Sequence, residues 1–246
     1  MRRCFVNAEY WHGDAIMLPD SEAHHLLHVL RIDAGERVCV FDGKGREAVA
    51  LVRRGEDGSI ELTADEIRDV VPRAFALTLI CAVVKGSRGD VIFEKATELG
   101  VARIIPVMTE RVVVRFNEMQ AAKRVKRWNR IAASAAKQCG TPWLPKIDNV
   151  SDYHDVLAAS RKFDAVLIGS LSDGSRPLKD VAAELHNRTE FKSLAVIIGP
   201  EGDLTADEER AALEAGAIPV SFGGLTLRAE TAALYAASVL AYEFLW

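Results

Sequence analysis

The second part of the chain consists of short apolar runs of strand length that alternate with amphipathic stretches of helix length. The apolar runs are Ala76–Val84, Val101–Val107, Ala165–Gly169, Leu194–Ile198 and Ile218–Phe222. Two neighbouring parallel strands need a long crossover between them, which is usually a helix, so this alternation indicates βαβ units. The sequence therefore predicts an α/β domain with a parallel sheet over residues 73–246, which begins after Pro72.

The first 72 residues have a different pattern, in which short β-prone segments are separated by glycine-rich turns. Two such turns are Asp42–Gly45 and Gly55–Gly58, and one helix is expected from about Ser21 to Arg31. Short strands joined by turns of this kind are typical of a small barrel. We therefore predict a separate β-barrel domain of residues 1–72.

Basic residues are concentrated in the middle of the chain. The net charge of the 246 residues is −4, yet residues 103–147 contain 10 basic and 2 acidic side chains. Basic residues beside one aromatic, Trp128, suit phosphate contacts and base stacking, although a solvated helix face has the same composition. The RNA-binding candidates in this predicted helix are Lys123, Arg124, Arg127 and Arg130.

No metal, membrane or secretion signal is found in the sequence. The four cysteines form no CxxC pair, and His24, His25 and His28 have no third ligand nearby, so we expect no metal site. No run reaches the roughly 18 apolar residues of a membrane span, and the N-terminus lacks the apolar core of a signal peptide. These features favour a cytoplasmic protein that does not bind membranes.

A glycine-rich segment, Ile198-Gly199-Pro200-Glu201-Gly202-Asp203, follows one of the predicted strands. It leads into a helix whose start is marked by the capping box Thr205-x-x-Glu208. Glycines let a ligand approach the backbone, and the first amides of a helix are free to bind it. A plain tight turn would explain one glycine, whereas the compact pair around Pro-Glu favours a ligand-binding loop.

A second glycine-bearing loop, Phe222-Gly223-Gly224-Leu225-Thr226-Leu227-Arg228, also follows a predicted strand and leads into a final helix from Glu230 to about Leu245. The carboxyl ends of parallel strands meet at one edge of the sheet, where ligands bind. Arg228 and Glu230 are candidate functional residues at this edge. A structural ion pair between them is the alternative.

Several blocks along the whole chain resemble one known family. They are His24–Arg31, Phe41–Gly45, Lys95–Val101 with Pro106, Gln138–Gly140 with Leu144-Pro145, Ile198–Gly202 and Leu227–Ala232. Each block alone is weak, but their ordered set resembles the ribosomal small subunit RNA (uracil-N3)-methyltransferases of the SPOUT superfamily.

This resemblance implies a fold and an activity. The fold would be a PUA-like RNA-binding barrel followed by a methyltransferase domain with a deep trefoil knot, in a homodimer. Periodicity alone would instead predict a Rossmann-like domain without a knot. The activity would be S-adenosylmethionine-dependent methylation of uracil N3 in 16S ribosomal RNA of the small ribosomal subunit.

The resemblance also implies roles for residues. The cofactor, S-adenosylmethionine, would be held by three loops, through Gly169, Ile198, Gly199, Pro200, Glu201, Gly202, Phe222, Gly223, Leu225 and Leu227. Arg228 would be catalytic with support from Glu230, and Arg31 joins the RNA-binding candidates. We expect Gly202 to have a positive φ, as a residue that holds the cofactor through its backbone.

The chain departs from the family pattern at several positions. Asp203 replaces a common glycine, and Asp is one of the few side chains that tolerate a positive φ. Lys137 stands where an acidic residue is common, and Thr141 where arginine is common. Two other functions stay open, a different SPOUT activity such as ribose 2′-O methylation and a non-catalytic RNA-binding assembly factor. No side chain in the motifs stands out as the general base.

Overall fold

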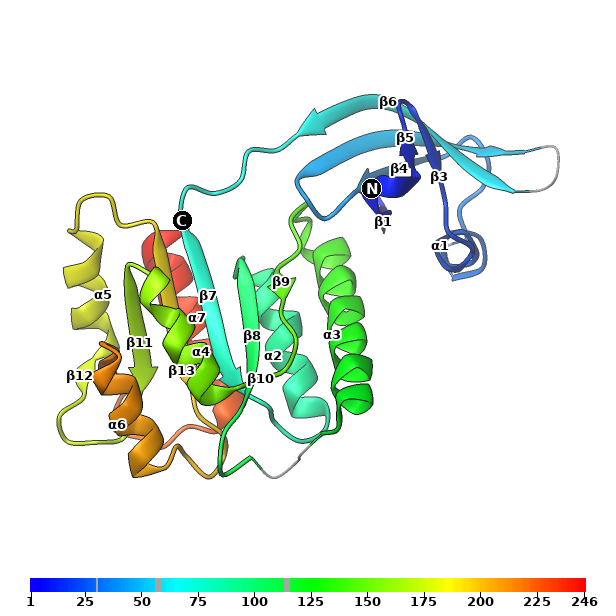
Figure 1. Ribbon diagram of the computed structural model, residues 1–246. Helices are drawn as coiled ribbons and strands as arrows, with labels where there is room; N and C mark the ends of the chain where they lie inside the picture. Colours follow the sequence, from blue (N-terminus) through cyan, green and yellow to red (C-terminus); the bar gives the residue numbers. More distant parts are fainter. Residues whose placement is uncertain (30, 56–58, 113–115) are drawn as a thin grey trace. The chain divides into compact units, whose positions relative to one another are not determined.

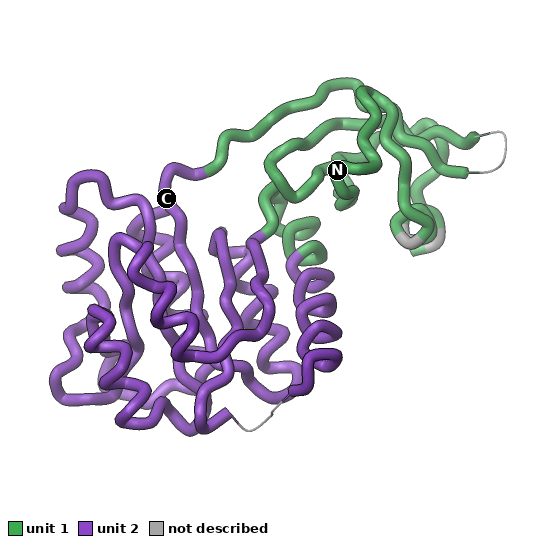
Figure 2. Tube along the Cα trace, viewed as in Figure 1, with its two compact units in different colours: residues 1–72, 133–144 green, residues 73–132, 145–246 purple. Residues whose placement is uncertain are grey.

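The computed structural model describes residues 1–29, 31–55, 59–112 and 116–246. The chain divides into two compact units, residues 1–72 with 133–144 and residues 73–132 with 145–246 (Figure 2). The sequence does not single out residues 133–144 as part of the first unit. They include the end of helix α3 (Glu118–Cys139), which begins in the second unit.

The first unit contains a six-stranded sheet with the strand order β1-β4-β5-β6-β3-β2. The strands are β1 (Arg3–Phe5), β2 (Trp11–His12), β3 (Ala15–Met17), β4 (Arg37–Phe41), β5 (Arg46–Arg54) and β6 (Ile60–Asp69), with a 3-10 turn at Ala8–Tyr10. Only β1 and β4 pair in parallel. Alternate residues of the long strands, such as Ala48, Ala50 and Val52, are buried in one core, as expected for a sheet with one covered face.

The helix of the first unit is shorter than the sequence indicates. Helix α1 covers Asp20–His24, and a π-helical turn follows over His25–Val29. Arg31 is exposed and has a φ of 51°. A residue in the left-handed region commonly ends a helix. The expectation of one regular helix from Ser21 to Arg31 is therefore wrong.

Residues 133–144 pack against the turn Asp42–Gly45. Gly45 has a φ of 99°, and a Cβ atom there would lie 2.2 Å from the Trp143 ring, so only glycine fits. The Leu144 amide donates to the Gly43 carbonyl at 2.9 Å. Lys137 pairs with Glu22 at 3.0 Å, and both side chains are 20% exposed. The ion pair with Glu22 gives Lys137 a structural role in the first unit.

The second unit contains a parallel sheet, which confirms the predicted class (Figure 1). The strand order is β10-β8-β7-β13-β11-β14-β12, with β9 beside β8, and every pairing is parallel. The strands are β7 (Ala76–Ala82), β8 (Arg103–Met108), β9 (Lys146–Ile147), β10 (Ser151–Asp152), β11 (Ala165–Gly169), β12 (Arg176–Pro177), β13 (Ser193–Ile198) and β14 (Ile218–Ser221).

Helices cover both faces of this sheet. One core contains residues of α2 (Ser87–Glu98), α3, α5 (Leu178–His186) and α7 (Ala229–Phe244). The other contains residues of α4 (Tyr153–Ala159) and α6 (Ala206–Glu214), and a 3-10 turn follows α4 at Ser160–Lys162. Along β13, Leu194, Val196 and Ile198 belong to the first core, while Ala195 and Ile197 belong to the second. A strand buried on both faces is continuously apolar, which is why the runs were visible in the sequence.

Within the described ranges, no helix is both long and apolar enough to cross a membrane. The same residues contain no group of three or more His, Cys, Asp or Glu side chains that could hold a metal ion. The trefoil knot and the homodimer stay predictions.

Candidate functional site

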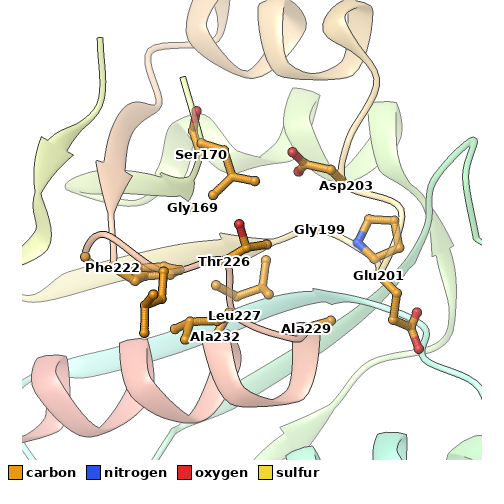
Figure 3. Close-up of a pocket in the computed structure, with 15 residues that line it drawn as sticks. Gly169, Ser170, Gly199, Glu201, Asp203, Phe222, Thr226, Leu227, Ala229 and Ala232 are labelled. Atoms are coloured by element: carbon orange, nitrogen blue, oxygen red, sulfur yellow. The ribbon is translucent and has the colours of Figure 1, made fainter. Parts of the chain in front are cut away.

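A pocket lies at the carboxyl edge of the sheet, where three neighbouring strands end. Strands β13, β11 and β14 are adjacent, so the loops that follow them come together (Figure 3). We call this cavity the three-loop pocket. It is lined by Gly169, Ser170, Leu171, Ile198, Gly199, Pro200, Glu201, Asp203, Phe222, Gly223, Leu225, Thr226, Leu227, Ala229 and Ala232.

Nine of the ten residues proposed from sequence to hold the cofactor line this pocket, and Gly202 does not. The pocket is also lined by six residues that were not proposed from sequence, namely Ser170, Leu171, Asp203, Thr226, Ala229 and Ala232. Ala229 and Ala232 are spaced by three residues at the start of α7, so both lie on one helix face. Small residues at that spacing beside a glycine-bearing loop are the signal that would have found them.

The glycines of the three loops differ in what requires a glycine at each position. A Cβ atom at Gly169 would lie 2.7 Å from the Phe222 ring, and Gly223 has a φ of 120° with nothing near its missing Cβ. Gly202 has no positive φ, and a Cβ there would make an ordinary contact with Arg111 at 3.5 Å. The expectation for Gly202 is thus wrong, because the left-handed residue is its neighbour Asp203, with a φ of 61°.

The loop after β13 is fixed from outside the pocket. Thr205 and Glu208 form the predicted capping box, with Thr205 N donating to Glu208 Oε2 at 2.9 Å and Glu208 N donating to Thr205 Oγ1 at 3.2 Å. The other oxygen of Glu208, Oε1, accepts from Glu110 N at 2.8 Å. Arg111 Nη1 donates to the Gly202 carbonyl at 3.0 Å. The segment after β8 therefore supports the loop of β13.

Two polar side chains mark one wall of the pocket. Ser170 is buried and donates from its hydroxyl to Glu209 Oε1, and it accepts from Ser172 N at 3.0 Å. Asp203 Oδ1 accepts from Leu204 N at 2.8 Å. On the side of α7 the lining is mainly apolar, with Phe222, Leu227, Ala229 and Ala232 (Figure 3).

Arg228 and Glu230 lie at the start of α7, next to the pocket but outside its lining. Arg228 is the N-cap residue, its side chain is exposed, and it forms no ion pair with any described residue. Glu230 Oε2 is buried without a hydrogen-bond partner in the described part of the chain. The structural ion pair between the two side chains is therefore absent from the structure.

The basic residues of α3 face a second cavity in the same unit. We call it the basic hollow, and it is lined by Gly86, Ser87, Asp90, Phe116, Gln120, Lys123, Arg124, Arg127 and Arg130. The structure thus brings together all four predicted RNA-binding residues of α3. Arg31, the fifth, is an exposed residue of the other unit.

Trp128 does not face this hollow. Its side chain is 1% exposed and stacks on Phe93 with 4.2 Å between ring centroids. The expectation that it stacks on RNA bases is wrong, because Trp128 lies with Val125 and Ile131 on the apolar stripe of α3, which packs in the core.

Comparisons with known proteins agree with the fold and the pocket. A family model described as an RNA methyltransferase domain matches residues 72–241, and one described as an RNA methyltransferase PUA domain matches residues 18–64. These two matches identify the class of the protein as an RNA-modifying enzyme. The chain belongs to the RNA methyltransferase family that these models describe.

Curated relatives and solved structures extend over nearly the whole chain. Ribosomal RNA small subunit methyltransferase E of Bacillus subtilis is 27% identical over 227 residues, which cover 90% of this chain and 88% of the relative. The enzyme of the same name from Neisseria gonorrhoeae, solved bound to S-adenosyl methionine, is 33% identical with a TM-score of 0.84 and covers 100% of this chain and 98% of its own. A Legionella pneumophila protein described as a methyltransferase, solved with bound cofactor SAM, is 29% identical with a TM-score of 0.87 and coverages of 98% and 96%.

Proposed function

We propose that this protein transfers a methyl group from S-adenosylmethionine to N3 of a uridine in 16S ribosomal RNA of the small ribosomal subunit. The observation that carries the proposal is the three-loop pocket at the carboxyl edge of a parallel sheet. The Neisseria gonorrhoeae enzyme, which matches this chain from end to end, was solved with S-adenosyl methionine bound.

The chemistry of the three-loop pocket fits this cofactor. Its floor consists of apolar side chains, among them Ile198, Leu227 and Ala232, and suits the flat face of an adenine ring. The loops add backbone amides and carbonyls, and Gly223 leaves the space that a Cβ atom would fill. Glu201 and Asp203 add carboxylates to a site for a positively charged sulfonium compound.

The bound cofactor supplies an electrophilic methyl group on its sulfonium. Uracil N3 carries a proton at neutral pH, so the protein must stabilise the negative charge that develops as this proton leaves. Arg228 is suited to this role because its guanidinium has five N–H donors and no ion-pair partner among the described residues. A preorganised donor at the position where charge develops is a large contribution to catalysis.

Glu230 supports Arg228 in this proposal. Its buried Oε2 atom accepts no hydrogen bond from any described residue, and a buried polar atom without a partner is rare in folded proteins. The first turn of α7 favours a carboxylate electrostatically. We propose that the missing donor comes from Arg228 or from the substrate when the reacting groups assemble.

The remaining features of the proposal follow from the family resemblance. RNA would be bound by the PUA unit, including Arg31, and by the basic residues of α3. The enzyme would act as a homodimer in the cytoplasm, and the trefoil knot would shape the three-loop pocket. The position of Lys123, Arg124, Arg127 and Arg130 around one hollow supports the proposal that α3 binds RNA.

A methylation assay tests the proposed activity. Small ribosomal subunits from cells that lack this protein are incubated with the full chain and S-adenosylmethionine, and the digested 16S RNA is analysed by mass spectrometry. We expect one new 3-methyluridine, which RNA from wild-type cells already contains. A ribose-methylated nucleoside would instead indicate the other SPOUT activity. A calorimetric titration without cofactor binding would indicate a non-catalytic assembly factor.

A further inference from the structure

The basic hollow differs from an ordinary charged helix face because its cations converge on one cavity. The cavity has a volume of about 620 Å³, and among the described residues four cationic side chains and one carboxylate, Asp90, line it. Arg127 follows Lys123 by four residues and Arg124 by three, and Arg130 follows Arg127 by three, so the four cations lie toward one side of α3. A cavity with this net positive charge concentrates anions.

Two of the arginines are held in place by neighbouring side chains. Arg127 Nε and Nη2 lie 3.0 and 2.5 Å from Asp90 Oδ2, and the Asp90 side chain is 15% exposed. The Arg124 guanidinium lies 4.9 Å over the centre of the Phe116 ring. A guanidinium that is already oriented loses less entropy when it binds a phosphate. The hollow is thus organised before any ligand arrives.

The hollow lies at the same edge of the sheet as the three-loop pocket. Gly86 and Ser87 follow β7, and β7 is the direct parallel neighbour of β13. Arg88, which comes next, pairs with Glu201 of the three-loop pocket at 3.7 Å. The start of α2 adds the positive end of a helix dipole to the same side of the hollow.

We propose that the basic hollow binds phosphodiester groups of a single-stranded RNA segment next to the nucleotide whose base enters the three-loop pocket. Asp90 is a positioning residue that orients Arg127, and Lys123, Arg124 and Arg127 are the groups that bind phosphate. This inference rests on the proposed function, because it takes the three-loop pocket as the site of methyl transfer. It adds a second, separate contact that fixes the strand while the base reacts.

Substitutions of Asp90 and of Lys123 in the hollow should change the affinity for RNA in opposite directions. Asp90→Asn keeps an amide oxygen for Arg127 but removes the charge that repels phosphate, so RNA should bind about threefold more tightly. Lys123→Gln removes a phosphate contact, so binding should weaken about threefold and the salt dependence should fall by a slope of about 0.7. A gain in affinity cannot result from partial unfolding.

The chain offers matched controls on the same helix. Lys126 and Glu118 are exposed residues of α3 outside the hollow. Lys126→Gln and Glu118→Gln therefore make the same changes in net charge without altering the cavity. All four variants of the full chain are measured by fluorescence anisotropy with a labelled, uridine-containing single-stranded RNA at several salt concentrations. The hollow variants should differ from wild type in opposite directions, and the controls should match wild type.

Two results would overturn the inference. If the controls change affinity as much as the hollow variants, α3 acts as a diffuse positive surface and no phosphate site exists. If neither hollow variant changes affinity or salt slope, RNA does not enter the hollow. Cofactor titration and the 16S RNA assay separate this failure from failure of the proposed function. A wild-type enzyme that forms 3-methyluridine would keep its proposed activity even when the hollow variants bind RNA normally.

Discussion

The three-loop pocket and the basic hollow open at the same edge of one sheet but consist of different parts of the chain. The three-loop pocket is formed by loop backbone, glycines and small apolar side chains, whereas long cationic side chains of one helix line the basic hollow. Backbone positions are set by the fold, while long side chains need a partner such as Asp90 or Phe116 to hold them. We therefore expect substitutions to have sharp effects at the three-loop pocket and graded effects at the hollow.

The largest effect is expected at Arg228, the cationic side chain beside the pocket. Arg228→Ala should lower the single-turnover rate by about 10²–10³, because it removes a donor that acts mainly in the transition state. The affinity for S-adenosylmethionine and the melting temperature should change little. Arg228→Lys should recover part of the rate, since a point charge lacks the planar fork of donors.

Arg210→Ala is a matched control, because Arg210 is an exposed arginine of α6 that pairs with Asp207. It should leave the rate unchanged. A normal rate per folded molecule in Arg228→Ala, together with a clear loss of stability, would assign Arg228 a structural role only.

The next largest effect concerns the backbone of the pocket. Gly223→Ala should weaken cofactor binding about tenfold, because an alanine at a φ of 120° is strained and Gly223 lines the pocket. Gly202→Ala should reduce affinity less than threefold, since Gly202 has no positive φ and does not line the pocket. Calorimetry with S-adenosylmethionine measures both. Equal losses in the two variants would show that the loop after β13 holds the cofactor through Gly202 as well.

Much of this architecture could be predicted from local sequence. The parallel sheet followed from continuous apolar runs, and the start of α6 followed from Thr205 and Glu208, whose capping box is formed as expected. The two glycine-bearing loops were placed together because carboxyl ends of parallel strands share an edge, whereas the loop after Gly169 followed only from the family resemblance. Each of these features depends on residues that are close in sequence or on a general rule of chain connection.

Features that depend on distant contacts could not be predicted in this way. The packing of Trp143 against Gly45 joins residues 133–144 to the first unit, and no local sequence pattern indicates this contact. The left-handed residue is Asp203 and not Gly202, in a loop whose Gly202 carbonyl accepts a hydrogen bond from the distant Arg111. Trp128 is a different case, because its position in the apolar stripe of α3 follows from the helical spacing and outweighs the charges beside it in sequence.

The smallest expected effect concerns the support of the pocket from outside. Thr205→Ala removes the hydroxyl that accepts from Glu208 N, but Glu208 can still accept from Thr205 N and from Glu110 N. Loss of one N-cap hydrogen bond typically costs about 1 kcal/mol, which corresponds to a melting temperature about 2–4 °C lower for a chain of this size. Thr205→Ser keeps the hydroxyl and should melt like wild type. Cofactor affinity should stay unchanged in both variants, because Thr205 does not line the three-loop pocket and three other hydrogen bonds still hold the loop in place. A marked loss of cofactor affinity in Thr205→Ala would show instead that the three-loop pocket depends on the start of α6. The three-loop pocket would then be less rigid than we infer, and it would differ less from the basic hollow.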